Sequence, residues 1–198
     1  MSDIVIRDLS KAYGNQPVLR NFSVKLKAGE VSCLMAPSGS GKTTLLHILL
    51  GLQRPDSGTV SGLEGKRISA VFQEDRLLEQ MDAVSNLRLV NPGLARGKAA
   101  EALAAVGITE AAGKPVRDFS GGMKRRVALL RALMCEWDVL IMDEPFRGLD
   151  EELRRQTAEW LLKRIDGRTV VMVTHDPEEA ALMNARIIDC HGFEGGTD

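Results

Sequence analysis

The sequence has little of what marks secreted, disulfide-stabilised or membrane-spanning proteins. Its three cysteines among 198 residues are odd in number and far apart, which argues against a disulfide framework or a zinc site and indicates a reducing compartment. No apolar run approaches the roughly 18 residues that a membrane-spanning helix needs. The first residues contain neither a basic start nor an apolar core, so we expect no signal peptide.

The chain also lacks an excess of charge of either sign. The 26 Lys and Arg residues nearly balance the 27 Asp and Glu residues, which leaves a net charge of −1. Such a chain has no overall positive field for holding nucleic acid or an anionic membrane. Apolar residues make up 44% of the chain and charged residues 27%, as expected for an ordinary globular domain.

Apolar strands alternate with helical segments along the chain. The pattern predicts strands near 4–6, 22–26, 31–35, 59–60, 68–72, 139–142, 169–173 and 186–190. It predicts helices near 43–50, 82–90, 98–106, 123–134, 151–165 and 177–183. Apolar strands separated by helices form mostly parallel sheets that helices cover on both faces, so the sequence predicts an α/β fold.

A glycine-rich loop between an apolar strand and an apolar helix carries the strongest chemical signal. It consists of Ser38, Gly39, Ser40, Gly41, Lys42, Thr43 and Thr44. In this context the glycines let backbone N–H groups converge on phosphate oxygens, and the helix N-terminus adds partial positive charge. We expect Lys42 to reach the β- and γ-phosphates of a nucleotide and the Thr43 hydroxyl to bind Mg²⁺. Ala36 stands where this P-loop motif has a glycine, and would cost about 1 kcal/mol if its φ had to be positive.

Two carboxylates follow the apolar strand near 139–142. Asp143 and Glu144 would lie at the carboxyl end of a parallel strand, the edge of a sheet where ligands bind. Asp143 suits a Mg²⁺ ligand, and Glu144 suits a base that orients the attacking water. An acidic pair that merely ends a strand is the alternative, and the P-loop makes it the weaker one.

Further short motifs stand in order around these two. They are Tyr13, Gln73, Ser120-Gly121-Gly122, Gly148-Leu149-Asp150 and Thr174-His175-Asp176. Each is weak alone, but with the P-loop and the acidic pair they make the chain resemble the nucleotide-binding ATPase subunits of ATP-binding-cassette (ABC) transporters over essentially its full length. One departure is Met123, which stands where glutamine is common in the family signature.

The resemblance implies a role for each motif. Tyr13 would stack on adenine, while Gln73 would contact the metal. Glu144 would be the base, with His175 and Gln73 positioning phosphate and water. The residues that would contact the nucleotide of a second subunit are Ser120, Gly121, Gly122 and Asp150.

The resemblance also implies a domain organisation. We expect a single domain, 1–198, with a P-loop core and a mostly parallel sheet. An antiparallel β part would lie near the N-terminus. A helical subdomain, about 75–134, would be inserted between the two core segments 1–74 and 135–191. Residues 192–198 would form a tail.

The function implied is Mg²⁺-dependent ATP hydrolysis that powers solute transport. The ATPase would work as a dimer of identical chains, without nucleic acid. It would lie peripherally on the cytoplasmic face of the cell membrane, against separate transmembrane permease subunits. The residues Gln73 to Leu78 and the Met123 form of the signature resemble importer ATPases for nitrate, sulfonate and taurine-type solutes.

Three alternatives come from related ATPases. Those that act on chromosomes insert a long coiled coil between P-loop and signature, whereas here Ser120 follows Lys42 by only 78 positions. Translation-associated cassettes carry two cassettes in one chain. A soluble ABC-type ATPase that acts as an assembly or regulatory factor stays open.

A basic cluster after the signature could suggest nucleic acid. It comprises Lys124, Arg125, Arg126 and Arg131. Because no aromatic platform interleaves these residues, we predict a solvated helix face instead.

Overall fold

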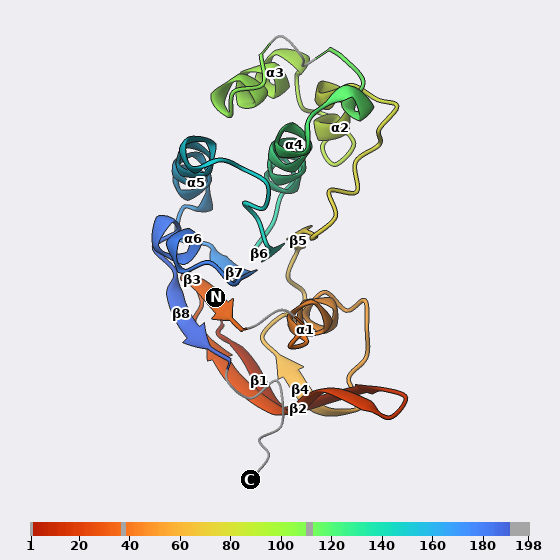
Figure 1. Ribbon diagram of the computed structural model, residues 1–198, viewed down its shortest axis with the longest axis vertical. Helices are drawn as coiled ribbons and strands as arrows, with labels where there is room; N and C mark the ends of the chain where they lie inside the picture. Colours follow the sequence, from red (N-terminus) through yellow and green to blue (C-terminus); the bar gives the residue numbers. More distant parts are fainter. Residues whose placement is uncertain (1, 37–38, 110–112, 191–198) are drawn as a thin grey trace.

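Two sheets of different kinds organise the molecule (Figure 1). The computed structural model describes residues 2–36, 39–109 and 113–190. One sheet is antiparallel, with strand order β2-β1-β4, and the other is parallel, with order β5-β6-β7-β3-β8. The predicted α/β fold, with an antiparallel part near the N-terminus, is confirmed.

The parallel sheet is built from five short strands. They are β3 (Val31–Met35), β5 (Ile68–Val71), β6 (Val139–Asp143), β7 (Thr169–Thr174) and β8 (Arg186–Asp189). Every residue of β6 and β7 is buried, as their unbroken apolar sequences predict for strands covered on both faces. Because β3 and β6 both run parallel to β7, which lies between them, the segments that follow β3 and β6 emerge at the same edge of the sheet.

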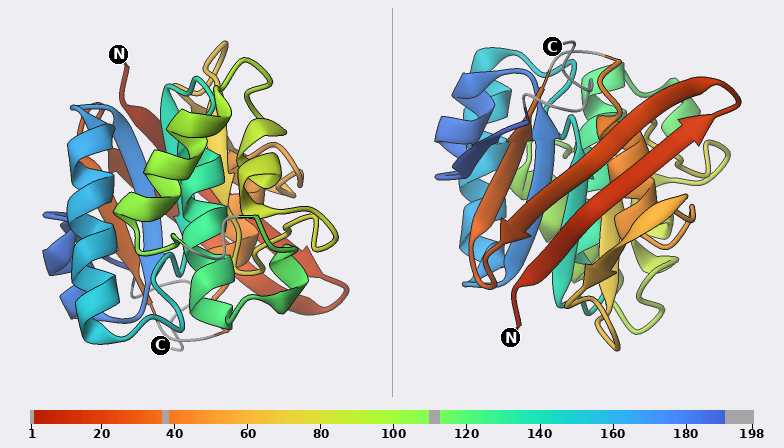
Figure 2. Two further views of the ribbon diagram at one scale, coloured as in Figure 1. Left: turned by 90° about the horizontal axis from the view of Figure 1, so that it is seen from above. Right: turned by 90° about the horizontal axis from the view of Figure 1, so that it is seen from below.

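The antiparallel sheet is dominated by a long hairpin of β1 (Ile4–Tyr13) and β2 (Gln16–Leu26), to which β4 (Ser57–Ser61) adds (Figure 2). The strands at 4–6 and 22–26 that the sequence predicts are only the buried ends of this hairpin. Its outer half is mostly polar and exposed or half-buried, so it has no clear hydrophobic alternation, and backbone pairing alone marks it as strand.

Helices cover the parallel sheet on both sides. They are α1 (Lys42–Leu49), α2 (Ala83–Arg88), α3 (Arg96–Ala105), α4 (Gly121–Leu133), α5 (Glu151–Ile165) and α6 (Pro177–Leu182). α1 packs with the antiparallel strands into one core, and a second core joins α2 to α6 with the opposite face of the sheet. In Figure 1 the helices α2, α3 and α4 gather at the end far from the hairpin. They all fall within the segment 75–134.

Candidate functional site

The glycine-rich loop joins β3 to α1. Gly39 and Gly41 have φ angles of +81° and +93°, a region that other residues rarely adopt. A Cβ at Gly41 would lie 2.7 Å from both the Cγ1 atom and the carbonyl oxygen of Val18, so the site needs glycine for space as well. Ser38, which the sequence also assigned to the loop, lies outside the described residues.

Lys42 is buried at the first position of α1. Its ammonium donates a hydrogen bond to the Ala36 carbonyl, with 2.6 Å between Nζ and the oxygen. Burial lowers the pKa of Lys42, and the nearby carboxylates of Glu144 and Asp143 oppose that shift. The ammonium therefore already lies among the acidic groups, within the loop that the sequence assigned to phosphate.

Ala36 carries no backbone penalty at the position where the motif has glycine. Within the described segments, the residues other than glycine that have positive φ are Asp8, Asn21, Arg76, Glu144, Asp166 and Asn184. Ala36 is not one of them, so the cost of about 1 kcal/mol that a positive φ would impose does not arise. Its methyl group is buried in the core that α1 shares with the antiparallel strands.

Thr43 and Asp143 come from opposite sides of β7 and meet. The Thr43 hydroxyl donates to Asp143, with 2.9 Å between Oγ1 and Oδ2. Burial raises the pKa of Asp143; the Thr43 hydrogen bond lowers it, and the neighbouring Glu144 charge raises it further. A bound cation would reverse this balance, because opposite charge favours the ionised carboxyl group.

The residues present fit Mg²⁺ and a phosphate. A pocket of about 280 Å³ is lined by Val18, Gly39, Gly41, Lys42, Thr43, Thr44, Gln73, Asp143 and Glu144. Thr43, Asp143 and Gln73 offer the hydroxyl, carboxylate and amide oxygens that a hard cation prefers. The Ser40 hydroxyl is buried and has no hydrogen-bond partner in the part of the chain that the structure describes, which is a buried polar group with room for a ligand atom.

Glu144 lines the pocket, and His175 lies beside Glu144. The His175 Nδ1 atom is 3.3 Å from Glu144 Oε1, and the imidazole is 65% exposed. Glu144 adopts a left-handed backbone conformation, with φ of +45°. Its N–H donates to the carbonyl of Val173, with 2.9 Å between the two atoms. A residue other than glycine in this conformation costs of order 1 kcal/mol and is typical of functional turns.

Tyr13 ends β1 next to α1. Its hydroxyl donates to Gln53 Oε1 at 2.7 Å and lies 3.4 Å from the Thr44 hydroxyl. Half of the tyrosine surface is exposed. The structure thus brings Tyr13 to the helix that carries the P-loop, with ring surface left open to solvent.

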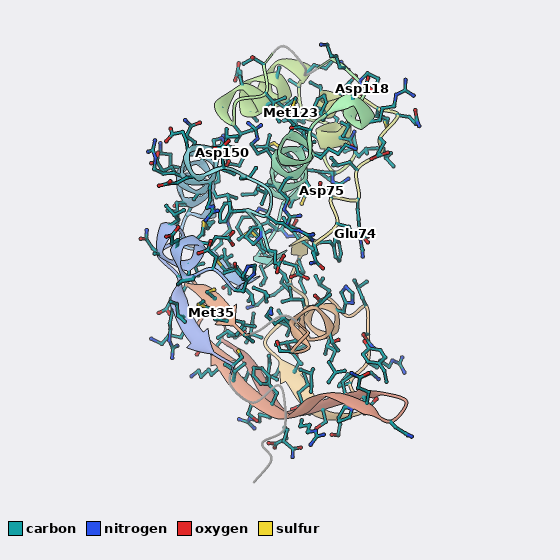
Figure 3. The ribbon with its side chains drawn as sticks, in the orientation of Figure 1. Met35, Glu74, Asp75, Asp118, Met123 and Asp150 are labelled. Atoms are coloured by element: carbon teal, nitrogen blue, oxygen red, sulfur yellow. The ribbon has the colours of Figure 1, made fainter. Side chains whose placement is uncertain are left out.

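The signature residues do not join this pocket. Ser120 begins α4, where its hydroxyl accepts from the N–H of Met123, and Asp150 caps α5 in the same way through Leu153. A Cβ at Gly122 would lie 3.2 Å from the Gly148 carbonyl, so glycine lets the signature and the Gly148–Asp150 segment approach. In Figure 3 the labelled Met123 and Asp150 lie toward the upper helices, away from Met35 at the end of β3.

A second hollow collects the signature residues. Its lining includes Gln73, Asp75, Ser120, Gly121, Gly122 and Asp150. Gln73 lines this hollow and the P-loop pocket alike. Within one chain the structure therefore brings the P-loop, Asp143, Glu144 and His175 together, and it places the signature elsewhere.

The basic cluster after the signature is partly buried, contrary to the sequence-based prediction. Arg125 and Arg126 are 2% and 5% exposed, so the predicted solvated helix face is wrong for both. Their guanidinium groups donate to backbone carbonyls instead: Arg125 to those of Asp143 and Glu144, and Arg126 to that of Gly122. The hydrophobic pattern did not predict this burial, because arginine counts as a polar residue even at a position that faces the core. The signal that could have predicted it is the position of both arginines among the apolar residues of the same helix.

Comparisons with known proteins agree with this geometry. A family model described as "ABC transporter" matches residues 19–147. The chain is 40% identical over 190 residues to the aliphatic sulfonates import ATP-binding protein SsuB 1 of Agrobacterium fabrum, covering 92% of this chain and 68% of that protein. It is 39% identical to the bicarbonate transport ATP-binding protein CmpD of Synechococcus elongatus, covering 93% of this chain and 74% of that protein.

Solved structures are similar as well. The dimeric structure of MJ0796, a bacterial ABC transporter cassette, superposes with a TM-score of 0.82 at 30% identity, covering 94% of this chain and 93% of that one. A post-hydrolysis state of the same cassette, bound to ADP and phosphate, has a TM-score of 0.81. Across the described ranges of the present chain, no helix combines the length and the apolar character needed to cross a membrane.

Proposed function

The chain belongs to the ABC transporter family, and on that premise we propose which of its residues bind and hydrolyse ATP, and where it works. Its activity is Mg²⁺-dependent ATP hydrolysis that powers transport through separate membrane subunits. The observation that carries the residue assignment is the convergence of Lys42, Thr43, Asp143 and Glu144 on one pocket.

The P-loop holds the triphosphate. Lys42 leaves the Ala36 carbonyl and reaches the β- and γ-phosphates, while N–H groups of the loop and of the α1 N-terminus donate to phosphate oxygens. Thr43 and Asp143, whose side-chain oxygens are 2.9 Å apart, would hold Mg²⁺ together with Gln73. The bound ion would neutralise charge that develops on the phosphates.

Glu144 orients the attacking water and accepts its proton. Its carboxylate lies at the pocket edge, beside the exposed His175 imidazole. His175 then stabilises the γ-phosphate, and Gln73 places water and metal relative to each other. Tyr13 offers its open ring surface to adenine.

The signature serves a second subunit. Ser120, Gly121, Gly122 and Asp150 line a hollow apart from the P-loop pocket, so they close over the nucleotide of the partner. A two-fold dimer satisfies both sites with one repeated interface. Dimer closure on ATP and reopening after hydrolysis would be the mechanical output.

The working position is the cytoplasmic face of the cell membrane, where the ATPase lies peripherally against permease subunits. Relatives named as sulfonate and bicarbonate ATP-binding proteins support a small-anion importer. The Met123 form of the signature points the same way.

The test of the assignment is Lys42→Ala. Without the ammonium we expect ATP affinity in the presence of Mg²⁺ to fall by at least about 10-fold, measured by calorimetric titration. Lys163→Ala is the matched control, because Lys163 is exposed on α5. Equal ATP affinity in the two folded variants would refute the P-loop assignment.

A further inference from the structure

Arg125 ties the helix that follows the signature to the turn that carries the catalytic carboxylates. Its Nη2 atom donates to the carbonyls of Asp143 and Glu144, at 2.5 and 2.6 Å. Its Nε atom donates to the carbonyl of Pro145 at 3.0 Å. Three consecutive carbonyl groups of this turn therefore converge on one guanidinium group.

The other edge of the same guanidinium holds the segment that contains Gln73. Nη1 donates to the Phe72 carbonyl at 2.6 Å and pairs with Asp75 Oδ1 at 3.1 Å. Figure 3 shows Asp75 in the middle of the molecule, between the upper helices and the lower sheet. Phe72 and Asp75 flank Gln73, so this residue is held from both sides.

The chemistry of arginine suits this junction. Arg125 is 2% exposed, and a planar fork of five N–H donors can satisfy several carbonyls at once, whereas a lysine ammonium cannot span them. Burial lowers the pKa of Arg125, and the Asp75 carboxylate opposes that shift. The buried cation is thus compensated on both edges, by carbonyl dipoles and by one carboxylate.

The backbone conformation of Glu144 depends in part on its hydrogen bond with Arg125. Its positive φ costs of order 1 kcal/mol, and such a conformation persists only where surrounding contacts hold it. The Arg125 bond to the Glu144 carbonyl is one such contact, and the bond from its N–H to Val173 is another. Arg125 therefore helps to fix the direction of the Glu144 carboxylate.

We propose that Arg125 is a positioning residue for hydrolysis, which fixes Glu144 relative to Gln73 and couples both to the signature helix α4. The inference rests on the proposed roles of Glu144 and Gln73. Arg125 also lines the signature hollow, but its N–H groups are already bonded to the carbonyls of the two segments, so no role in binding ATP or Mg²⁺ is assigned to it. It acts through the backbone of the two segments that it joins.

Arg131 provides a matched control on the same helix. Its guanidinium donates to the carbonyls of Asp75 and Arg76, at 3.0 and 2.8 Å. It therefore holds the segment after Gln73, as Arg125 does, but within the described residues it has no hydrogen bond to the 143–145 turn. Comparing Arg125→Lys with Arg131→Lys separates the joining of the two segments from general anchoring of α4.

The first measurement is amide hydrogen exchange without nucleotide, which does not depend on activity. In Arg125→Lys we expect exchange to quicken by about 10-fold in 72–75 and in 143–147 together, because both lose a shared partner. In Arg131→Lys only the segment near 75–76 should exchange faster. Quickening confined to one segment in Arg125→Lys would overturn the proposed linkage.

The second measurement is steady-state ATP hydrolysis by the full chain. Arg125→Lys should lower kcat by at least about 10-fold and leave ATP affinity within about 2-fold, because misplacement of the base affects the chemical step rather than binding. Arg131→Lys should keep most of kcat. A normal kcat in Arg125→Lys, or equal losses in both variants, would overturn the positioning role. An unmodified chain that neither binds nor hydrolyses ATP would instead overturn the proposed function.

Discussion

The P-loop pocket and the signature hollow differ in how complete they are. Around the P-loop, the polar groups already bond to one another: Lys42 to a loop carbonyl, Thr43 to Asp143, and Glu144 next to His175. At the signature, the hydrogen bonds described for the side chains of Ser120 and Asp150 cap their own helices. A site whose polar groups interact before a ligand binds is preorganised. The signature residues, by contrast, form helix caps beside a hollow and would form a binding site only together with a second subunit.

We expect substitution of Glu144 to change the rate of ATP hydrolysis more than any other change considered below. If the P-loop pocket is a complete binding site, Glu144→Gln should keep ATP affinity, because the amide preserves shape and lies beside the phosphate cradle rather than in it. Turnover should fall by at least about 100-fold, since the amide cannot accept the proton of water. Calorimetric titration and a phosphate-release assay measure the two quantities. Hydrolysis at the unmodified rate would mean that another group is the base.

The P-loop and the signature can be tested separately by disabling each on a different chain. Lys42→Ala disables the P-loop but keeps the signature, and Ser120→Arg does the reverse. In an equal mixture, half of the dimers contain one intact composite site, so we expect about one quarter of the unmodified activity. Each variant alone should be nearly inactive. If mixing restores no activity while both variants remain folded, composite sites between identical chains are excluded.

The sequence and the structure contribute differently to the two regions. The P-loop side was predictable because a strand, a glycine-rich loop and a helix carry local signals, and because Asp143 follows a strand that is apolar throughout. The strand order, which puts β7 between β3 and β6, was not predictable from spacing. It depends on tertiary pairing.

Arg125 shows where sequence patterns fail. A basic run such as Lys124, Arg125 and Arg126 is typical of a solvated helix face, and only Lys124 follows that expectation in part, by pairing with Glu79. The acceptors of Arg125 are backbone carbonyls, which every residue has, so no residue type in the sequence marks them. The left-handed backbone conformation of Glu144 could not be predicted from the sequence either, because glutamate has no preference for positive φ.

Asp143 in the P-loop pocket should also affect the thermal stability of the nucleotide-free chain. Burial raises the pKa of Asp143, so charging it destabilises the folded chain, and its stability contribution is lost as pH rises through the folded pKa. The asparagine side chain in Asp143→Asn cannot ionise. The nucleotide-free variant should therefore melt about 3 °C higher at neutral pH, and this gain should vanish at acidic pH, where the aspartate is neutral too.

Asp150→Asn is the control from the signature side. Asp150 caps α5, and asparagine caps a helix about as well, so this variant should melt at the unmodified temperature. Stabilisation by ATP with Mg²⁺ should be lost in Asp143→Asn. An Asp143→Asn chain that is less stable than the unmodified one at neutral pH would show that its hydrogen bond to Thr43 outweighs the burial of charge.

Substitution of Ala36, at the border of the P-loop pocket, should change only the stability of the chain, and only slightly. Because its φ is not positive, Ala36→Gly relieves no strain there. Glycine instead adds conformational freedom to the unfolded chain and removes a buried methyl group, so the variant should lose up to about 1 kcal/mol of unfolding free energy. Denaturant unfolding measures that loss, and ATP affinity should stay unchanged, because the Ala36 group that bonds Lys42 is its carbonyl. A gain in stability would contradict the φ angle of Ala36 in the free chain, and a gain in ATP affinity would mean that the loop adopts positive φ at this position once nucleotide binds.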